Sequence, residues 1–104
     1  MTPETITLPA SLSIRGISEI HESFLSAFED HTAIVLDIPD DATADLSFIQ
    51  LVESSRRHAR EQGKFITLKK PAAAGVVETL QRGGFLANMD EASRLFWLHG
   101  KEIQ

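Results

Sequence analysis

The sequence predicts an α/β fold, with about four helices packed on a mixed β-sheet of about four or five strands. Three observations predict this class. Short segments near the start alternate polar and apolar residues, a continuous apolar run lies in the first half, and other segments repeat apolar residues at the helical period. The resulting order is β-β-α-β-α-β-α-(β)-α. Because strands alternate with helices after the first two, we expect parallel crossovers within the sheet.

The first third of the chain predicts two short strands and a helix. Residues 5–8 and 11–14 each alternate polar and apolar side chains, with Pro9 and Ala10 between them, which is typical of a hairpin buried on one face. Gly16 ends the second strand. From Ile17 to about Asp30, the apolar residues that share one helical face are Ile17, Ile20, Phe24, Leu25 and Phe28.

The middle third predicts a central strand and a second helix. Residues 32–38 are a β-branched and apolar run that Pro39 ends, so we expect a central strand covered on both faces. After a polar loop over residues 40–44, a helix is expected from about Asp45 to Gln62, with Gly63 as its end signal. The residues on its sheet-facing stripe are Ile49, Val52, Ala59 and, through its aliphatic stem, Arg56.

The last third predicts a strand over residues 64–69, a third helix, a short edge strand over residues 85–87 and a final helix. The third helix covers residues 75–82, ends at Gly83 and Gly84, and buries Val76, Val77 and Leu80. Asp90 is expected to be the N-cap of the final helix. The apolar side of that helix carries Leu95, Phe96 and Leu98.

Length and composition limit the possible functions. At 104 residues, the chain is expected to be a single domain over residues 1–104. Its net charge of −5 argues against binding to nucleic acid or to anionic membranes. The chain has no cysteine, so disulfides and thiol chemistry are excluded. No signal peptide and no apolar run of roughly 20 residues is found, so we expect a cytoplasmic protein without membrane insertion.

No residue pattern predicts an enzyme, a metal site or a cofactor. The four histidines, which are His21, His31, His58 and His99, lack the spacing of metal ligands. The acidic loop around residues 37–45 lacks the register of a calcium site, and no phosphate-binding loop or nucleophile-elbow serine is found. The basic residues Arg56, Arg57 and Arg60 are expected to form a solvated face near the C-terminal end of the second helix.

Residues 45–51 carry the most informative pattern in the chain. Ser47 is expected near the N-terminus of the second helix, where free N–H groups and the helix dipole favour an anion. A phosphate on Ser47 would bring about −1.5 to −2 charges to this position. A purely structural interpretation is also open, because Ser47 and Gln50 match a capping box and Asp45 could be the N-cap instead.

The chain resembles the STAS domain, the fold of the anti-sigma-factor antagonists and their relatives. The residues that carry the resemblance are the strand Ala33-Ile34-Val35-Leu36-Asp37, the helix start Asp45-Leu46-Ser47-Phe48-Ile49-Gln50-Leu51 and the strand Gly63-Lys64-Phe65-Ile66-Thr67-Leu68. The likeness extends from Ile6 to the last helix. Its most specific part is a strand that ends in Leu-Asp, followed about eight residues later by an aspartate that begins a helix.

The family's helix start reads D-S-[ST]-G-L, and its third residue is phosphorylated by a partner serine kinase. By position, the resemblance implies that Asp45 is the leading aspartate, Ser47 the phosphoacceptor and Ile49 the buried leucine. Leu46 and Phe48 depart from the pattern. Phe48 replaces the glycine that lets a kinase approach, so it either blocks a generic kinase or serves as an exposed aromatic anchor for a specific partner.

Two functions from different classes follow from this resemblance. The first is a regulatory module whose partner, a kinase-like or sensor protein, binds around Asp37, Asp45, Leu46, Phe48 and Gln50 until Ser47 is phosphorylated. The second is a constitutive adaptor that docks on a transporter ATPase or sensor complex without phosphorylation. A small-ligand sensor that uses Trp97 is a third possibility. If Phe48 is exposed as expected, this side chain and the short edge strands also allow a weak homodimer.

Overall fold

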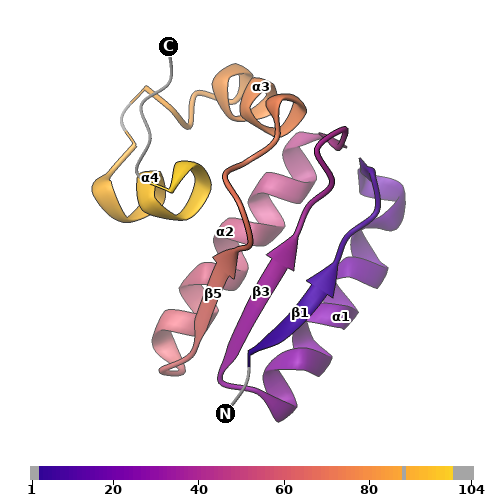
Figure 1. Cartoon of the computed structure of the whole chain (residues 1–104), viewed down its shortest axis with the longest axis vertical. Coiled ribbons are helices and arrows are strands. Elements are labelled where there is room, and N and C mark those ends of the chain that lie inside the picture. The colour runs from indigo at the N-terminus through magenta and orange to yellow at the C-terminus, as the bar shows by residue number, and fades with distance from the viewer. Residues whose placement is uncertain (1–2, 88, 100–104) are drawn as a thin grey trace.

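The computed structural model describes residues 3–87 and 89–99 and consists of helices and short parallel strands (Figure 1). In chain order the elements are β1 (Glu4–Thr7), β2 (Ser11–Leu12), the 3₁₀ helix η1 (Ile14–Gly16), α1 (Ile17–Asp30), β3 (Ala33–Asp37), β4 (Thr43–Ala44), α2 (Leu46–Glu61), β5 (Phe65–Leu68), α3 (Ala74–Arg82) and α4 (Glu91–Leu98). The α/β class and the four α-helices agree with the prediction.

The strands form two small parallel sheets rather than one mixed sheet. The larger sheet has the order β1-β3-β5, and the smaller pairs β2 with β4. The predicted hairpin is wrong, because β1 pairs with β3 and β2 with β4. A two-residue hairpin turn needs positive φ values that Pro9 cannot adopt. The chain instead crosses from one sheet to the other here: Leu8 N–H donates to Asp37 O and Thr43 N–H donates to Ala10 O.

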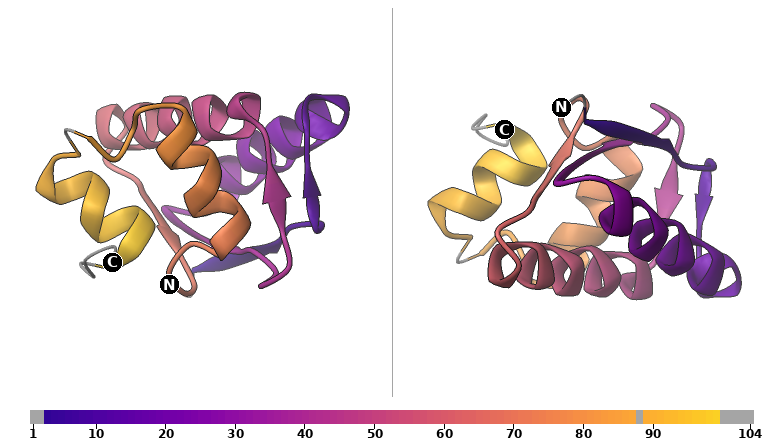
Figure 2. Two further views of the ribbon diagram at one scale, coloured as in Figure 1. Left: turned by 90° about the horizontal axis from the view of Figure 1, so that it is seen from above. Right: turned by 90° about the horizontal axis from the view of Figure 1, so that it is seen from below.

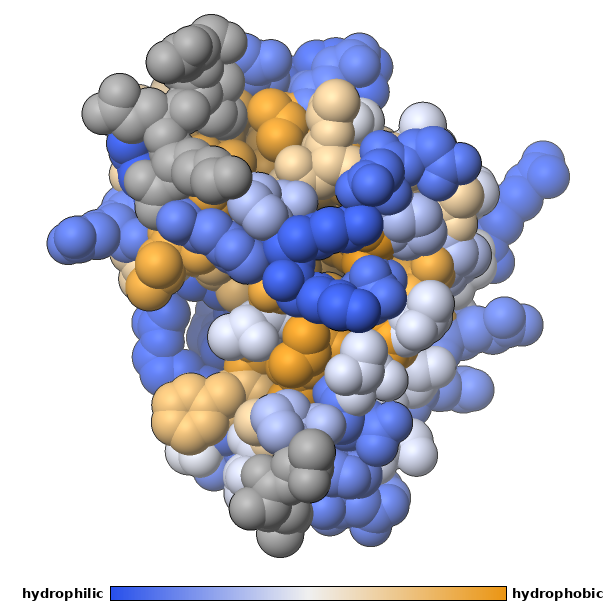
Figure 3. Space-filling view, viewed as in Figure 1, coloured by the Kyte–Doolittle hydropathy of each residue, from blue (hydrophilic) through white to orange (hydrophobic). Residues whose placement is uncertain are grey.

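Helices α1 and α2 cover one face of the larger sheet (Figures 1 and 2). Ile34, Leu36, Ile66 and Leu68 point to that face and are buried. Among the described residues, no helix covers the opposite, open face, so the prediction of a central strand covered on both faces is wrong. Along each strand, the side chains of the open face alternate with the buried ones, because successive side chains of a strand point to opposite faces. Figure 3 shows this open face as a mixture of hydrophilic and hydrophobic surface.

The first two helices lie where their apolar periodicity predicts them. In α1, Ile20, Phe24 and Phe28 are buried, whereas Leu25 at the border of the stripe is 45% exposed. In α2, the buried residues are Phe48, Ile49, Val52, Ser55 and Ala59. The sequence prediction missed β4, which consists only of Thr43 and Ala44. Two residues in a polar loop are too few to show the alternation that indicates a strand.

The segment after α3 ends the helix instead of forming the expected edge strand. Gly84 has φ 79°, a left-handed conformation that suits glycine. Gly84 N–H donates to Gln81 O and Phe85 N–H donates to Leu80 O, which is the bonding pattern of a Schellman motif. Residues 85–87 are therefore a turn. The backbone N–H of Phe85 is bonded to the last turn of α3, so it is not available for strand pairing.

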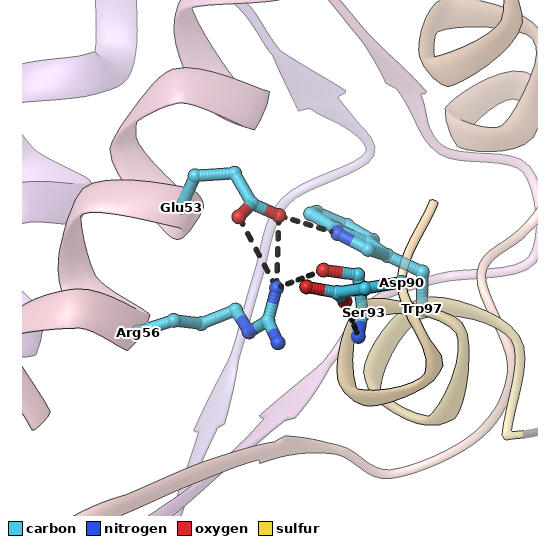
Figure 4. Close-up of polar contacts among 5 residues, drawn as sticks. All are labelled: Glu53, Arg56, Asp90, Ser93 and Trp97. Atoms are coloured by element: carbon cyan, nitrogen blue, oxygen red, sulfur yellow. Dashed lines mark hydrogen bonds and ion pairs between the residues drawn. The ribbon is translucent and has the colours of Figure 1, made fainter. Parts of the chain in front are cut away.

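A polar cluster attaches α4 to α2 (Figure 4). Arg56 Nη1 lies 3.1 Å from both carboxylate oxygens of Glu53 and 3.2 Å from Ser93 Oγ, and Trp97 Nε1 donates to Glu53 Oε1 at 2.8 Å. The guanidinium also lies over the ring of Phe96, 4.6 Å from its centroid. The Arg56 side chain is only 10% exposed, so its predicted place on a solvated face is wrong.

The cap predicted for α4 is confirmed, because Asp90 Oδ1 accepts from Ser93 N–H at 2.7 Å. Phe96, Trp97 and Leu98 are buried, whereas Leu95, predicted on the apolar side, is 64% exposed. Among the described residues, no helix combines the length and the apolar character that crossing a bilayer requires.

Candidate functional site

The start of α2 is organised by the carboxylate of Asp45. Asp45 is the N-cap, has an extended backbone and accepts from Phe48 N–H at 3.3 Å. Its other oxygen accepts from Ile14 N–H at 2.8 Å, and its own N–H donates to Leu12 O at 3.0 Å. One side chain thus joins the β2–η1 segment to the first turn of α2, although 31 positions separate Ile14 from Asp45.

Ser47 lies inside the first turn of α2, half-buried, and its hydroxyl donates to Asp45 Oδ1. Ser47 is therefore not the N-cap, so the capping-box interpretation is wrong and the alternative with Asp45 as the cap is confirmed. The hydrogen bond from Ser47 is the largest cause that holds the pKa of Asp45 below its usual value. The amides of Ile14 and Phe48 lower this pKa further, while desolvation opposes them.

The predicted partner-binding residues separate into exposed and buried ones. Leu46 is 44% exposed, and Gln50 is exposed one turn further along α2. Phe48 is fully buried, so it cannot act as an exposed aromatic anchor or support a homodimer in this conformation. The reason is its position: Phe48 shares the core-facing stripe of α2 with Ile49 and Val52.

Asp37 belongs to a different part of the surface. It ends β3 on the open face of the sheet, and its carboxylate lies 3.7 Å from Lys69 Nζ after β5. The residues that follow make a second pair, in which Asp40 Oδ1 lies 2.8 Å from Lys70 Nζ. In the part of the chain that the structure describes, no hydrogen bond or ion pair joins Asp37 to Asp45 or Ser47.

Three contacts at this site escape the sequence prediction. Ile14, whose amide bonds Asp45, is 67% exposed and places a second apolar side chain next to the start of α2. Thr79 of α3 is buried and donates to Ala44 O at 2.6 Å. Gly75 packs so closely on Ala42 that a Cβ there would overlap the carbonyl oxygen. A short polar loop carries no periodicity that could have revealed these long-range contacts.

The histidines stay apart from this site. His31 lies 3.4 Å from Glu4, and the ring of His99 lies 3.0 Å from Leu68 O. Over residues 3–87 and 89–99, no three His, Asp or Glu side chains are arranged to hold a metal ion. Trp97 is fully buried, with its N–H bonded to Glu53, so it packs in the core.

In comparisons with known proteins, this chain matches no family model, no curated protein and no solved structure.

Proposed function

We propose that this chain is a cytoplasmic, non-catalytic protein-interaction module that resembles the anti-sigma-factor antagonists and is switched by phosphorylation of Ser47. One observation carries the proposal: the Ser47 hydroxyl is bonded to the same carboxylate that caps α2 and holds the Ile14 amide. A change at Ser47 therefore reaches two segments of the surface. The exposed apolar side chains of Ile14 and Leu46 border this point and supply contact area for a protein partner.

The physical basis of the switch is repulsion between two anions. The carboxylate of Asp45 already occupies the Phe48 N–H and accepts the Ser47 hydroxyl, so a phosphate on Ser47 would lie beside a carboxylate. The phosphate removes the hydroxyl donor and adds about −1.5 to −2 charges beside Asp45. We expect Asp45 to leave its cap, which releases Ile14 and changes the surface that the partner binds.

The test combines mass spectrometry with partner capture in the native host. We expect phosphate on Ser47 in the wild-type chain, a stable complex with Ser47→Ala and loss of the complex with Ser47→Asp. Ser54→Ala and Ser54→Asp, on an exposed serine of the same helix, serve as matched controls that leave the complex unchanged. An unmodified Ser47 under all growth conditions, with a complex that survives Ser47→Asp, would refute the switch.

A constitutive adaptor that docks on a transporter ATPase or sensor complex is the second candidate. The half-buried Ser47 and its occupied hydroxyl favour it, because a kinase would have to pull the first turn of α2 away from Asp45. The buried ring of Phe48 in the same turn adds to this resistance. A stoichiometric complex with an ATPase that is indifferent to Ser47→Asp would identify the adaptor.

A further inference from the structure

Helix α3 lies against the segment that leads into α2. Gly75, Thr79 and Gly83, the last of which is the C-cap of α3, are spaced by four positions. Residues at this spacing lie above one another on the same face of a helix. Seen from above in Figure 2, this helix lies beside β4.

The first two contacts of this face are made with main-chain atoms. Gly75 packs on Ala42 so closely that a Cβ would overlap the carbonyl oxygen. One turn further along α3, the buried hydroxyl of Thr79 donates to Ala44 O at 2.6 Å. Because the atoms met on the segment are backbone carbonyls, neither contact can adjust by rotation of a side chain of the segment.

The third contact joins Gly83 to the side chain of Leu46. A Cβ on Gly83 would lie 3.1 Å from Leu46 Cδ1 and 2.9 Å from two ring atoms of Phe85. The backbone of Gly83 has φ −81°, which any residue can adopt, so the available space and not the conformation favours glycine here.

The two rows of residues match in spacing. Four residues of an α-helix rise about 6 Å, and two residues of an extended chain rise about 6.6 Å. Both β4 and Asp45 are extended, so alternate positions of the segment meet every fourth position of α3. We call these three contacts the α3 seam. Its pairs are Gly75 with Ala42, Thr79 with Ala44, and Gly83 with Leu46.

Asp45 lies within the segment side of the α3 seam. Its two neighbours in the chain, Ala44 and Leu46, both contact α3. Peptide units are planar and adjacent Cα atoms are about 3.8 Å apart, so the backbone of Asp45 cannot move far without its neighbours. The carboxylate of the same residue caps α2 and holds the Ile14 amide. The cap and the α3 seam therefore share one short piece of backbone.

We propose that α3 responds to the state of Asp45. When the carboxylate leaves its cap, Ala44 and Leu46 shift, the α3 seam opens and α3 loosens from the rest of the molecule. As regulation of the same site, this inference rests on the proposed function, because a phosphate on Ser47 acts through Asp45. The surface that changes then includes the exposed side chains of α3, which are Ala74, Glu78, Gln81 and Arg82.

The test removes the cap directly and follows amide hydrogen exchange of single residues by NMR in the full chain. In Asp45→Ala, we expect the exchange of Leu80 in α3 to speed up about tenfold more than that of Leu36 in the central strand. Leu36 reports global unfolding, so the difference between the two amides isolates the loosening of α3. Asp41→Ala, at an exposed position of the same loop, should leave both amides within about twofold of wild type.

A second pair of variants tests whether the α3 seam carries the effect. Thr79→Val removes the hydroxyl at its centre, and Thr67→Val makes the same change at an exposed position of β5. In the Thr79→Val background, Asp45→Ala should accelerate Leu80 no more than Leu36. In the Thr67→Val background, and with Thr79→Ser, which keeps the hydroxyl, the full difference should remain. Circular dichroism checks the folding of each variant, and the comparison with Asp41→Ala decides the proposal even if Thr79→Val does not fold.

Three results would overturn the proposal. They are equal acceleration of Leu80 and Leu36 in Asp45→Ala, the same difference between these amides in Asp41→Ala, and full coupling in a folded Thr79→Val background. All variants keep Ser47, so the outcome does not depend on whether that serine is phosphorylated. An unmodified Ser47 in the host would refute the switch and leave the coupling of α3 to Asp45 intact, so the two failures are distinguishable.

Discussion

Asp45 does three things with one carboxylate. It caps α2 through Phe48 N–H, accepts the Ser47 hydroxyl and holds the amide of Ile14. Charged acceptors make stronger hydrogen bonds than neutral ones, and three donors converge on this group. A change at Asp45 therefore reaches both the first turn of α2 and the β2–η1 segment.

Replacement of Asp45 should make the protein less stable and less sensitive to acid. Asp45→Ala removes the cap and leaves the Ile14 amide without its acceptor, so we expect a loss of about 1–2 kcal/mol in urea unfolding at neutral pH. Asp41→Ala, at an exposed position in the same loop, is the control and should change the free energy by less than about 0.5 kcal/mol.

The pH dependence has a definite sign. Because the pKa of Asp45 is lower in the folded chain than in the unfolded one, its stabilisation is complete above the unfolded value and is lost as pH falls through the folded value. Urea midpoints measured from neutral pH down to about pH 3 should therefore converge for wild type and Asp45→Asn. Parallel curves would contradict this assignment.

At the scale of elements, α3 and α4 are held by other kinds of contact than α1 and α2. The α2–β5 and α1–β3 contacts are apolar, as the amphipathic patterns predict. The contact between α4 and α2 depends on the Glu53–Arg56 pair, with Ser93 and Trp97 as further partners. The start of α3 depends on the close approach of Gly75 to Ala42.

Arg56 should matter more than its neighbour Arg57. Arg56→Ala leaves the carboxylate of Glu53 without its cation and removes the guanidinium that lies over the Phe96 ring, so we expect a loss of about 1–3 kcal/mol in unfolding free energy. Arg57→Ala, on the exposed side of the same helix, should cost less than about 0.5 kcal/mol. Equal losses would show that the cluster does not hold α4.

Two glycines provide a second matched comparison. Gly75→Ala places a methyl group against the carbonyl of Ala42, so α3 must move, and we expect a loss of about 1–3 kcal/mol. Gly16→Ala meets no atom within 4 Å and should change the stability by less than about 1 kcal/mol. Thermal unfolding followed by circular dichroism measures both variants.

At the scale of the whole molecule, the helices could be predicted from the sequence and the strand pairing could not. The stripes of α1 and α2 and the caps Asp45 and Asp90 are local signals that a short window contains. Pairing is a long-range property: nothing within residues 4–12 shows that their partners are β3 and β4 and not each other. At the candidate site, the sequence was enough to single out Asp45 and Ser47. The burial of Phe48 could not be predicted in the same way, because it depends on which side of α2 faces the core.

The parallel pairing has a consequence for the order of folding. Partners in all three strand pairs lie 30 to 32 positions apart in the chain. No strand can therefore meet its partner until the intervening segment has closed a long loop, and that segment contains α1 or α2. We expect these helices to gain structure before any strand pair does, and the chain to reach its native state more slowly than helical bundles of similar length.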